Sequence, residues 1–142
     1  MPRTIEHIVG CHEAAQALRK AGKPIWKKQI DVLSIIHEDQ QNESPEHICA
    51  ISNRIARLIR NKAPASHFDV FHDYFDSDFV DAVESMESCT IKELAVDKAN
   101  GVEAVDIFNG WLESIYDWAD VNRIWLGRVD NDAQSVLHSK EH

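Results

Sequence analysis

The chain has 142 residues, of which 44% are hydrophobic and 27% charged, and its formal net charge at pH 7 is −9. This composition suits one globular domain with a conventional hydrophobic core, and it excludes a disordered, collagen-like or low-complexity protein. The longest apolar runs are far too short to span a bilayer, and the N-terminal residues match neither a secretory signal nor a transit peptide. We therefore expect a cytoplasmic protein that does not bind membranes.

The charges are distributed unevenly along the chain. Residues 68–132 carry sixteen acidic and four basic side chains, a net charge of −12, whereas residues 1–67 carry ten basic and seven acidic ones. A surface with one strong sign of charge attracts partners of the opposite sign, and an acidic surface repels phosphate backbones. We therefore expect a protein partner with a basic surface and no direct binding to nucleic acid.

Helix signals cover most of the sequence. We predict a first helix from the N-cap Thr4 to Gly22, because glycine commonly ends helices. Pro24 suits the first turn of a second helix, which the apolar pattern through Trp26 extends to Ile36. A polar segment then separates this helix from the next one.

The third predicted helix has a strong start signal, with Ser44 as the N-cap and Pro45 in the first turn. It should end near Lys62, because Ala63 precedes Pro64 and a residue before proline disfavours helical geometry. One face of this helix carries a short basic stripe, which we interpret as an ordinary solvated face. The stripe consists of Arg54, Arg57 and Arg60.

The second half of the chain continues the helical pattern. Aromatic residues at steps of three and four predict a helix that carries Phe68, Phe71, Phe75 and Phe79. A break around Ser77 with a restart toward Met86 is one alternative, and a less favoured one is a strand. Thr90 and Glu93 have the spacing of a capping box and should open a short helix that ends by Gly101. The last predicted helix is the longest, from about Val102 to Leu126.

Together these signals predict an all-α single domain, residues 1–142, built as a bundle of five to seven helices with a long C-terminal helix that bears tryptophans. Residues 128–142 should form a flexible C-terminal tail. The sequence contains no internal repeat, no Ser/Gly linker and no convincing β-hairpin.

The last predicted helix carries a tryptophan every seven residues, at Trp111, Trp118 and Trp125. Such a repeat places three large rings along one seam, which is typical of a central core helix. Tryptophan is also enriched in interface hot spots, so a homodimer seam or a partner contact is a second interpretation. We expect Trp118 to be the most buried and Trp125 to be a partly exposed anchor. Asn122 interrupts the seam and could set the register of a helix pair.

A dense acidic run precedes this helix, and it contains Asp69, Asp73, Asp76, Asp78, Asp81, Glu84 and Glu87. Steps of three and four residues share one helix face, where like charges repel. Two interpretations stay open, a solvated face that aids solubility and a surface that imitates nucleic-acid phosphates and occupies a basic groove of another protein. The candidate partner-binding residues are the six acids from Asp69 to Glu84 together with Trp125.

The pair His72-Asp73 resembles the two-residue core that names the HD phosphohydrolases. The resemblance implies an all-helical, metal-dependent enzyme that hydrolyses phosphate esters. In that family a further upstream His and a downstream Asp complete the metal site. His37 stands upstream in this chain, and Asp130 or Asp132 stands downstream.

Other enzyme motifs are absent from the sequence. It has no glycine-rich phosphate loop, no Gly-x-Ser-x-Gly elbow and no His-Glu-x-x-His zinc helix. Cys11, Cys49 and Cys89 are odd in number and widely spaced, which fits reduced thiols better than disulfides or a thiolate zinc site. We therefore expect no catalytic residue, no bound metal and no cofactor.

Composition and charge favour a small acidic non-catalytic protein that binds another protein. One form of this function is an inhibitor that covers a nucleic-acid-binding or nuclease surface through an acidic, phosphate-mimicking face. Immunity proteins against nuclease toxins and phage or plasmid anti-defence proteins are similar in size, charge and lack of catalytic motifs. The alternatives are a metal-dependent phosphohydrolase of the HD kind and a helical structural subunit that oligomerises through its tryptophan seam.

Overall fold

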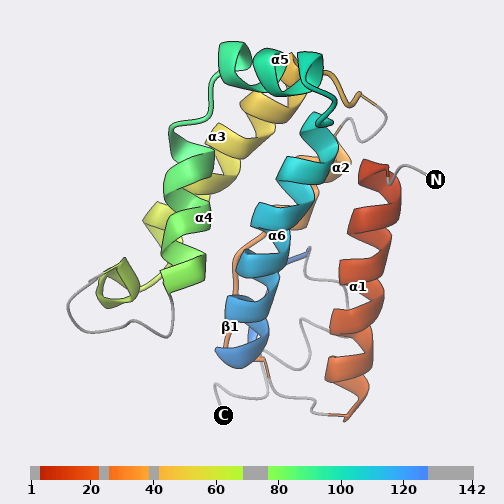
Figure 1. The fold of residues 1–142 in the computed structure, drawn as a ribbon. Helices are drawn as coiled ribbons and strands as arrows, with labels where there is room; N and C mark the ends of the chain where they lie inside the picture. The colour runs from red at the N-terminus through yellow and green to blue at the C-terminus, as the bar shows by residue number, and fades with distance from the viewer. Residues whose placement is uncertain (1–3, 23–25, 39–41, 69–76, 128–142) are drawn as a thin grey trace.

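The computed structural model describes residues 4–22, 26–38, 42–68 and 77–127. Within these ranges the fold consists of six α-helices, a 3-10 helix and one pair of short strands, which confirms the predicted all-α class (Figure 1). In chain order the elements are α1 (Ile5–Gly22), β1 (Lys28–Gln29), α2 (Val32–His37), α3 (Pro45–Lys62), η1 (Ala65–Phe68), α4 (Ser77–Glu87), α5 (Ile91–Ala99), α6 (Ala104–Val121) and β2 (Ile124–Trp125). None of the described helices is long and apolar enough to cross a bilayer.

The predicted N-caps are confirmed. The side-chain oxygens of Thr4, Ser44 and Thr90 each accept a hydrogen bond from the backbone N–H three residues later, at 3.1, 3.2 and 3.2 Å. The predicted ends of two helices also hold, because α3 ends at Lys62 and the chain leaves α5 through Gly101 at a φ of 88°. Local sequence signals therefore fix these helix boundaries.

The prediction of the second helix, from Pro24 to Ile36, is wrong for its first half. The segment that follows Trp26 forms β1, and the helix α2 begins only at Val32. Asp31 caps α2, because its Oδ1 accepts a hydrogen bond from the backbone N–H of Ser34 at 3.2 Å. The apolar pattern suited either structure over so short a segment, and pairing with a distant strand decided between them.

The last predicted helix is too long. The helix α6 ends at Val121, and Arg123 then adopts a φ of 56°, a left-handed conformation that turns the chain out of the helix. Asn122 is the C-cap of α6 and does not lie within a helical seam. Trp125 belongs to β2, so the seven-residue tryptophan repeat does not continue along one helix surface.

A buried side chain that the sequence did not single out attaches α1 to the strand pair. β1 and β2 run parallel, and each is only two residues long. Gln16 of α1 is 1% exposed, and its amide donates to the carbonyl of Ile124 at 2.9 Å and accepts from the N–H of Leu126 at 3.1 Å. This amide satisfies two buried backbone groups of the β2 segment, so it connects α1 to β2.

The helix α6 is central in the bundle. It contacts α1, α3, α4 and α5, and Figure 1 shows it between α1 and α4, with α5 lying across one end. The hydrophobic core draws buried side chains from all six described α-helices. Trp118 is 3% exposed, whereas Trp111 and Trp125 are half-buried, so Trp118 is the most buried of the three, as predicted.

Candidate functional site

The acidic run predicted as a partner surface lies partly on α4. There the side chains of Asp78, Asp81 and Glu84 are exposed, and they form no ion pair with another described residue. The other three predicted acids, Asp69, Asp73 and Asp76, lie outside the described residues. Their contribution to the surface therefore stays a prediction.

Sequence reasoning missed a second set of acids on α6. These are Asp106, Glu113 and Asp117, all of them exposed and without an ion pair to a described residue. Steps of seven and four residues place them near one another on the helix surface, and this spacing was a signal in the sequence. The prediction for this segment used its tryptophan-bearing apolar face and not its acids.

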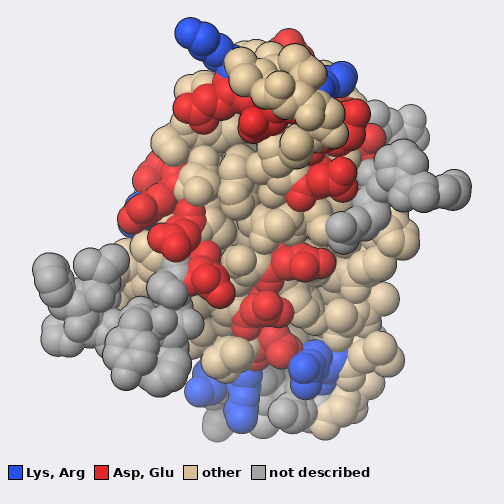
Figure 2. Space-filling view, in the orientation of Figure 1, with Lys and Arg blue, Asp and Glu red and all other residues tan. Residues whose placement is uncertain are grey.

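Figure 2 shows that acidic side chains gather over α4 and α6 on one side of the molecule, with further acids near α5. Residues 77–127 contain eleven acidic and three basic side chains. Basic side chains appear in this view mainly at the two ends of the bundle. We define the acidic face by its exposed members on the two helices, which are Asp78, Asp81, Glu84, Asp106, Glu113 and Asp117.

Aromatic contacts fix the two helices of the acidic face to each other. Phe79 of α4 stacks on Trp118 of α6, with ring centroids 4.0 Å apart and planes 9° from parallel. The indole Nε1 of Trp118 donates a hydrogen bond to Nδ1 of His67 at 2.9 Å, so this histidine must accept through Nδ1. The carboxylates of α4 and α6 are therefore displayed from a rigid, buried base.

The basic stripe of α3 is largely taken up by ion pairs. Arg54 donates to both carboxylate oxygens of Glu38, at 2.6 and 3.0 Å, and this hydrogen bonding raises the pKa of Arg54. Arg60 binds Glu87 in the same two-pronged manner, at 3.0 Å to each oxygen. Exposed pairs of this kind contribute little stability, but they neutralise charge on α3 and on Glu87, the last residue of α4.

His12 of α1 is buried against α6. The ring of His12 packs on Tyr116 with centroids 4.8 Å apart, and burial lowers the pKa of His12. Glu113 and Asp117 oppose this shift because their negative charges favour the protonated ring. The acidic face is thus electrostatically linked to a titratable group in the core.

Trp125 does not lie with the acids of α4. Its ring makes an edge contact with Trp26 at 5.4 Å between centroids, and the ammonium of Lys20 lies 5.8 Å from its centroid. Its other neighbours come from α1 and α2, where it lines a pocket. The structure therefore separates Trp125 from the acidic residues with which it was grouped.

The histidines do not form a metal site within the described part of the chain. His37 is hydrogen-bonded through Nε2 to Glu13 of α1. His72, Asp73, Asp130 and Asp132 lie outside the described residues, so the HD site stays a prediction. Among the described residues no group of three or more His, Cys, Asp or Glu side chains is placed to hold a metal ion.

Comparison of the chain with protein-family models, with curated proteins and with solved structures finds no match.

Proposed function

We propose that this protein binds a basic surface of another protein through the acidic face of α4 and α6. One observation carries the proposal, namely that exposed carboxylates on two neighbouring helices lack ion-pair partners among the described residues and share a rigid aromatic base. Like charges held close together repel, and a cationic partner removes this repulsion.

Charge complementarity also defines the class of partner. Proteins that bind nucleic acids present clustered lysine and arginine side chains to phosphates. A rigid array of carboxylates can bind such a cluster in place of the phosphates. Unlike a flexible charged tail, it holds its negative charges at fixed positions. We therefore propose that the protein acts as an inhibitor that masks a nucleic-acid-binding or nuclease surface.

The test compares two double variants with the same change in net charge. Asp81→Asn with Asp117→Asn removes one carboxylate from each helix of the acidic face. Glu6→Gln with Glu46→Gln is the control, since both acids are exposed on α1 and α3, outside this face. Binding is measured against a panel of basic nucleases and nucleic-acid-binding proteins at low and at physiological salt, together with nuclease inhibition.

We expect the acidic-face variant to slow association with an inhibited nuclease about threefold or more at low salt, with a smaller effect as salt screens the charges. The control variant should change association less than about twofold, because its charges lie farther from the contact. Equal effects of the two variants would show that overall charge alone matters and would contradict the proposal. A purified chain with one divalent metal ion, lost in His72→Ala, would instead favour the phosphohydrolase.

A further inference from the structure

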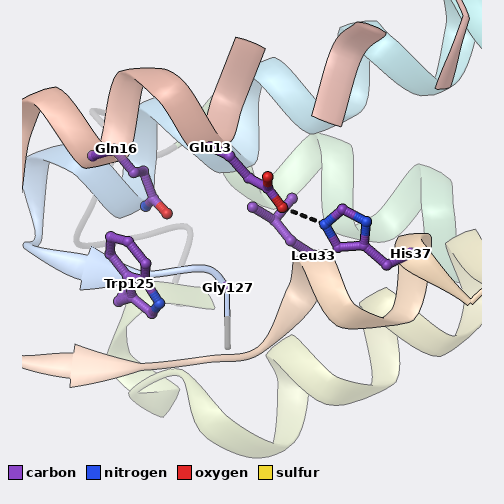
Figure 3. Close-up of a pocket in the computed structure, with 7 residues that line it drawn as sticks. Glu13, Gln16, Leu33, His37, Trp125 and Gly127 are labelled. Carbon is purple, nitrogen blue, oxygen red and sulfur yellow. Dashed lines mark hydrogen bonds and ion pairs between the residues drawn. The ribbon is translucent and has the colours of Figure 1, made fainter. Parts of the chain in front are cut away.

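A second candidate site lies away from the acidic face, in a cavity of about 330 Å³ between α1, α2 and the β2 segment (Figure 3). This volume falls within the range of small-molecule sites in proteins. Its lining comes from three separate parts of the chain and consists of Glu13, Gln16, Ala17, Leu33, His37, Trp125 and Gly127.

One end of the cavity is apolar and partly aromatic. The indole of Trp125 forms the wall there, and Ala17 contributes only a methyl group. The side chain of Leu33 lies nearer Glu13 and His37 and reaches toward Gly127 (Figure 3). A β-carbon at Gly127 would lie 3.5 Å from the indole nitrogen of Trp125 and 3.8 Å from Leu33. Because glycine has no side chain, Gly127 leaves the space between the indole of Trp125 and the side chain of Leu33 open.

The other end of the cavity is polar. Glu13 and His37 form a hydrogen-bonded pair across α1 and α2, as Figure 3 shows. An ionised carboxylate only accepts hydrogen bonds, so the imidazole donates its Nε2 proton to one oxygen of Glu13. No described residue donates to the second oxygen, which remains an acceptor for a ligand.

The remaining polar side chain of the lining, Gln16, already forms hydrogen bonds within the protein. The amide of Gln16 donates to Ile124 and accepts from Leu126, so both of its functional atoms are committed to the β2 backbone. The cavity therefore offers a ligand two kinds of contact. One end has a flat apolar wall, and the other end has a carboxylate that accepts a hydrogen bond.

We propose that this cavity binds a small planar aromatic molecule that carries an N–H donor. The ring of the ligand lies against Trp125 and Leu33, where stacking and burial of apolar area favour binding. Its N–H group donates to Glu13, which His37 holds in place. This site is independent of the acidic face, so either proposal stands if the other fails.

Indole and benzofuran are suitable probes, because they have nearly the same shape and only indole has an N–H group. Binding is followed by NMR through the indole N–H signal of Trp125, which is assigned by its loss in Trp125→Phe. Ala17→Leu fills the cavity from an exposed position of α1. Ala14→Leu is the matched control, since Ala14 is also exposed on α1 and does not line the cavity.

We expect indole to shift the Trp125 signal saturably, with a dissociation constant of the order of 1 mM or tighter. Benzofuran should bind about fivefold or more weakly, because it cannot donate to the carboxylate. Ala17→Leu should weaken indole binding about tenfold, whereas Ala14→Leu should leave it unchanged.

Glu13→Met removes the acceptor and keeps a long side chain with good helix propensity, so it should abolish the preference for indole over benzofuran. The proposal is overturned if the shift does not saturate, if both leucine variants bind indole equally, or if Glu13→Met keeps the preference.

Discussion

Replacing Trp118 with alanine tests how α4 is held against α6. The indole is 3% exposed, stacks on Phe79 and donates its only N–H to His67. Removal of a large aromatic side chain from a core costs about 3 to 5 kcal/mol of unfolding free energy. Because Phe79 would lose its stacking partner as well, we expect a value in the upper part of this range.

The companion variant Trp125→Ala is the control, because it removes a tryptophan from β2 and not from α6. Trp125 is half-buried beside an open cavity, so less apolar area returns to water and we expect a loss of about 1 to 2 kcal/mol. Urea unfolding followed by circular dichroism measures both variants under the same conditions. For a chain of this size, the difference corresponds to a gap in melting temperature of several degrees.

The result also bears on the acidic face. If Phe79 and Trp118 hold α4 and α6 together, hydrogen exchange in α4 should become faster in Trp118→Ala than in Trp125→Ala. Equal losses of stability in the two variants, or unchanged exchange in α4, would refute the reasoning that the stacked pair forms the rigid base of the acidic face.

Three further predictions concern single side chains. His67→Ala leaves the indole N–H of Trp118 without an acceptor and should cost about 1 to 3 kcal/mol, whereas adding His67→Ala to Trp118→Phe should cost less, as a double-mutant cycle in urea would show. The unfolded chain has His12 at its ordinary pKa of 6.5 and the folded state has it lower, so the unfolded state binds more protons as the pH falls through 6.5. Stability should therefore fall from about pH 7.5 to about pH 5, and His12→Phe should reduce this fall in denaturation curves taken at both pH values. Burial raises the pKa of Cys89 to about 12, so mass spectrometry should find exposed Cys11 alkylated first in the native protein, and equal labelling of the two thiols would contradict this prediction.

The sequence determined the parts of the fold that depend on neighbouring residues. The start of α1, α3 and α5 follows from hydroxyl side chains at Thr4, Ser44 and Thr90, because a cap needs only the backbone three residues further on. The burial of Trp118 likewise follows from an apolar face at helical spacing. The position of the α6 acids on one helix surface could also have been predicted, since it follows from their spacing alone.

The tertiary structure decided whatever depends on distant segments. The pattern around Trp125 continues a helical repeat, yet the backbone N–H of Ile30 donates to the carbonyl of Trp125 at 2.8 Å, and Gln16 binds the residues on either side of it. Local spacing carries no information about such partners, so the helix prediction failed there. The acidic face needs Phe79 stacked on Trp118, across 39 residues of chain, and the cavity needs three segments to meet. Only the packed chain brings these groups together, because long-range hydrogen bonds and core contacts override local helix preference.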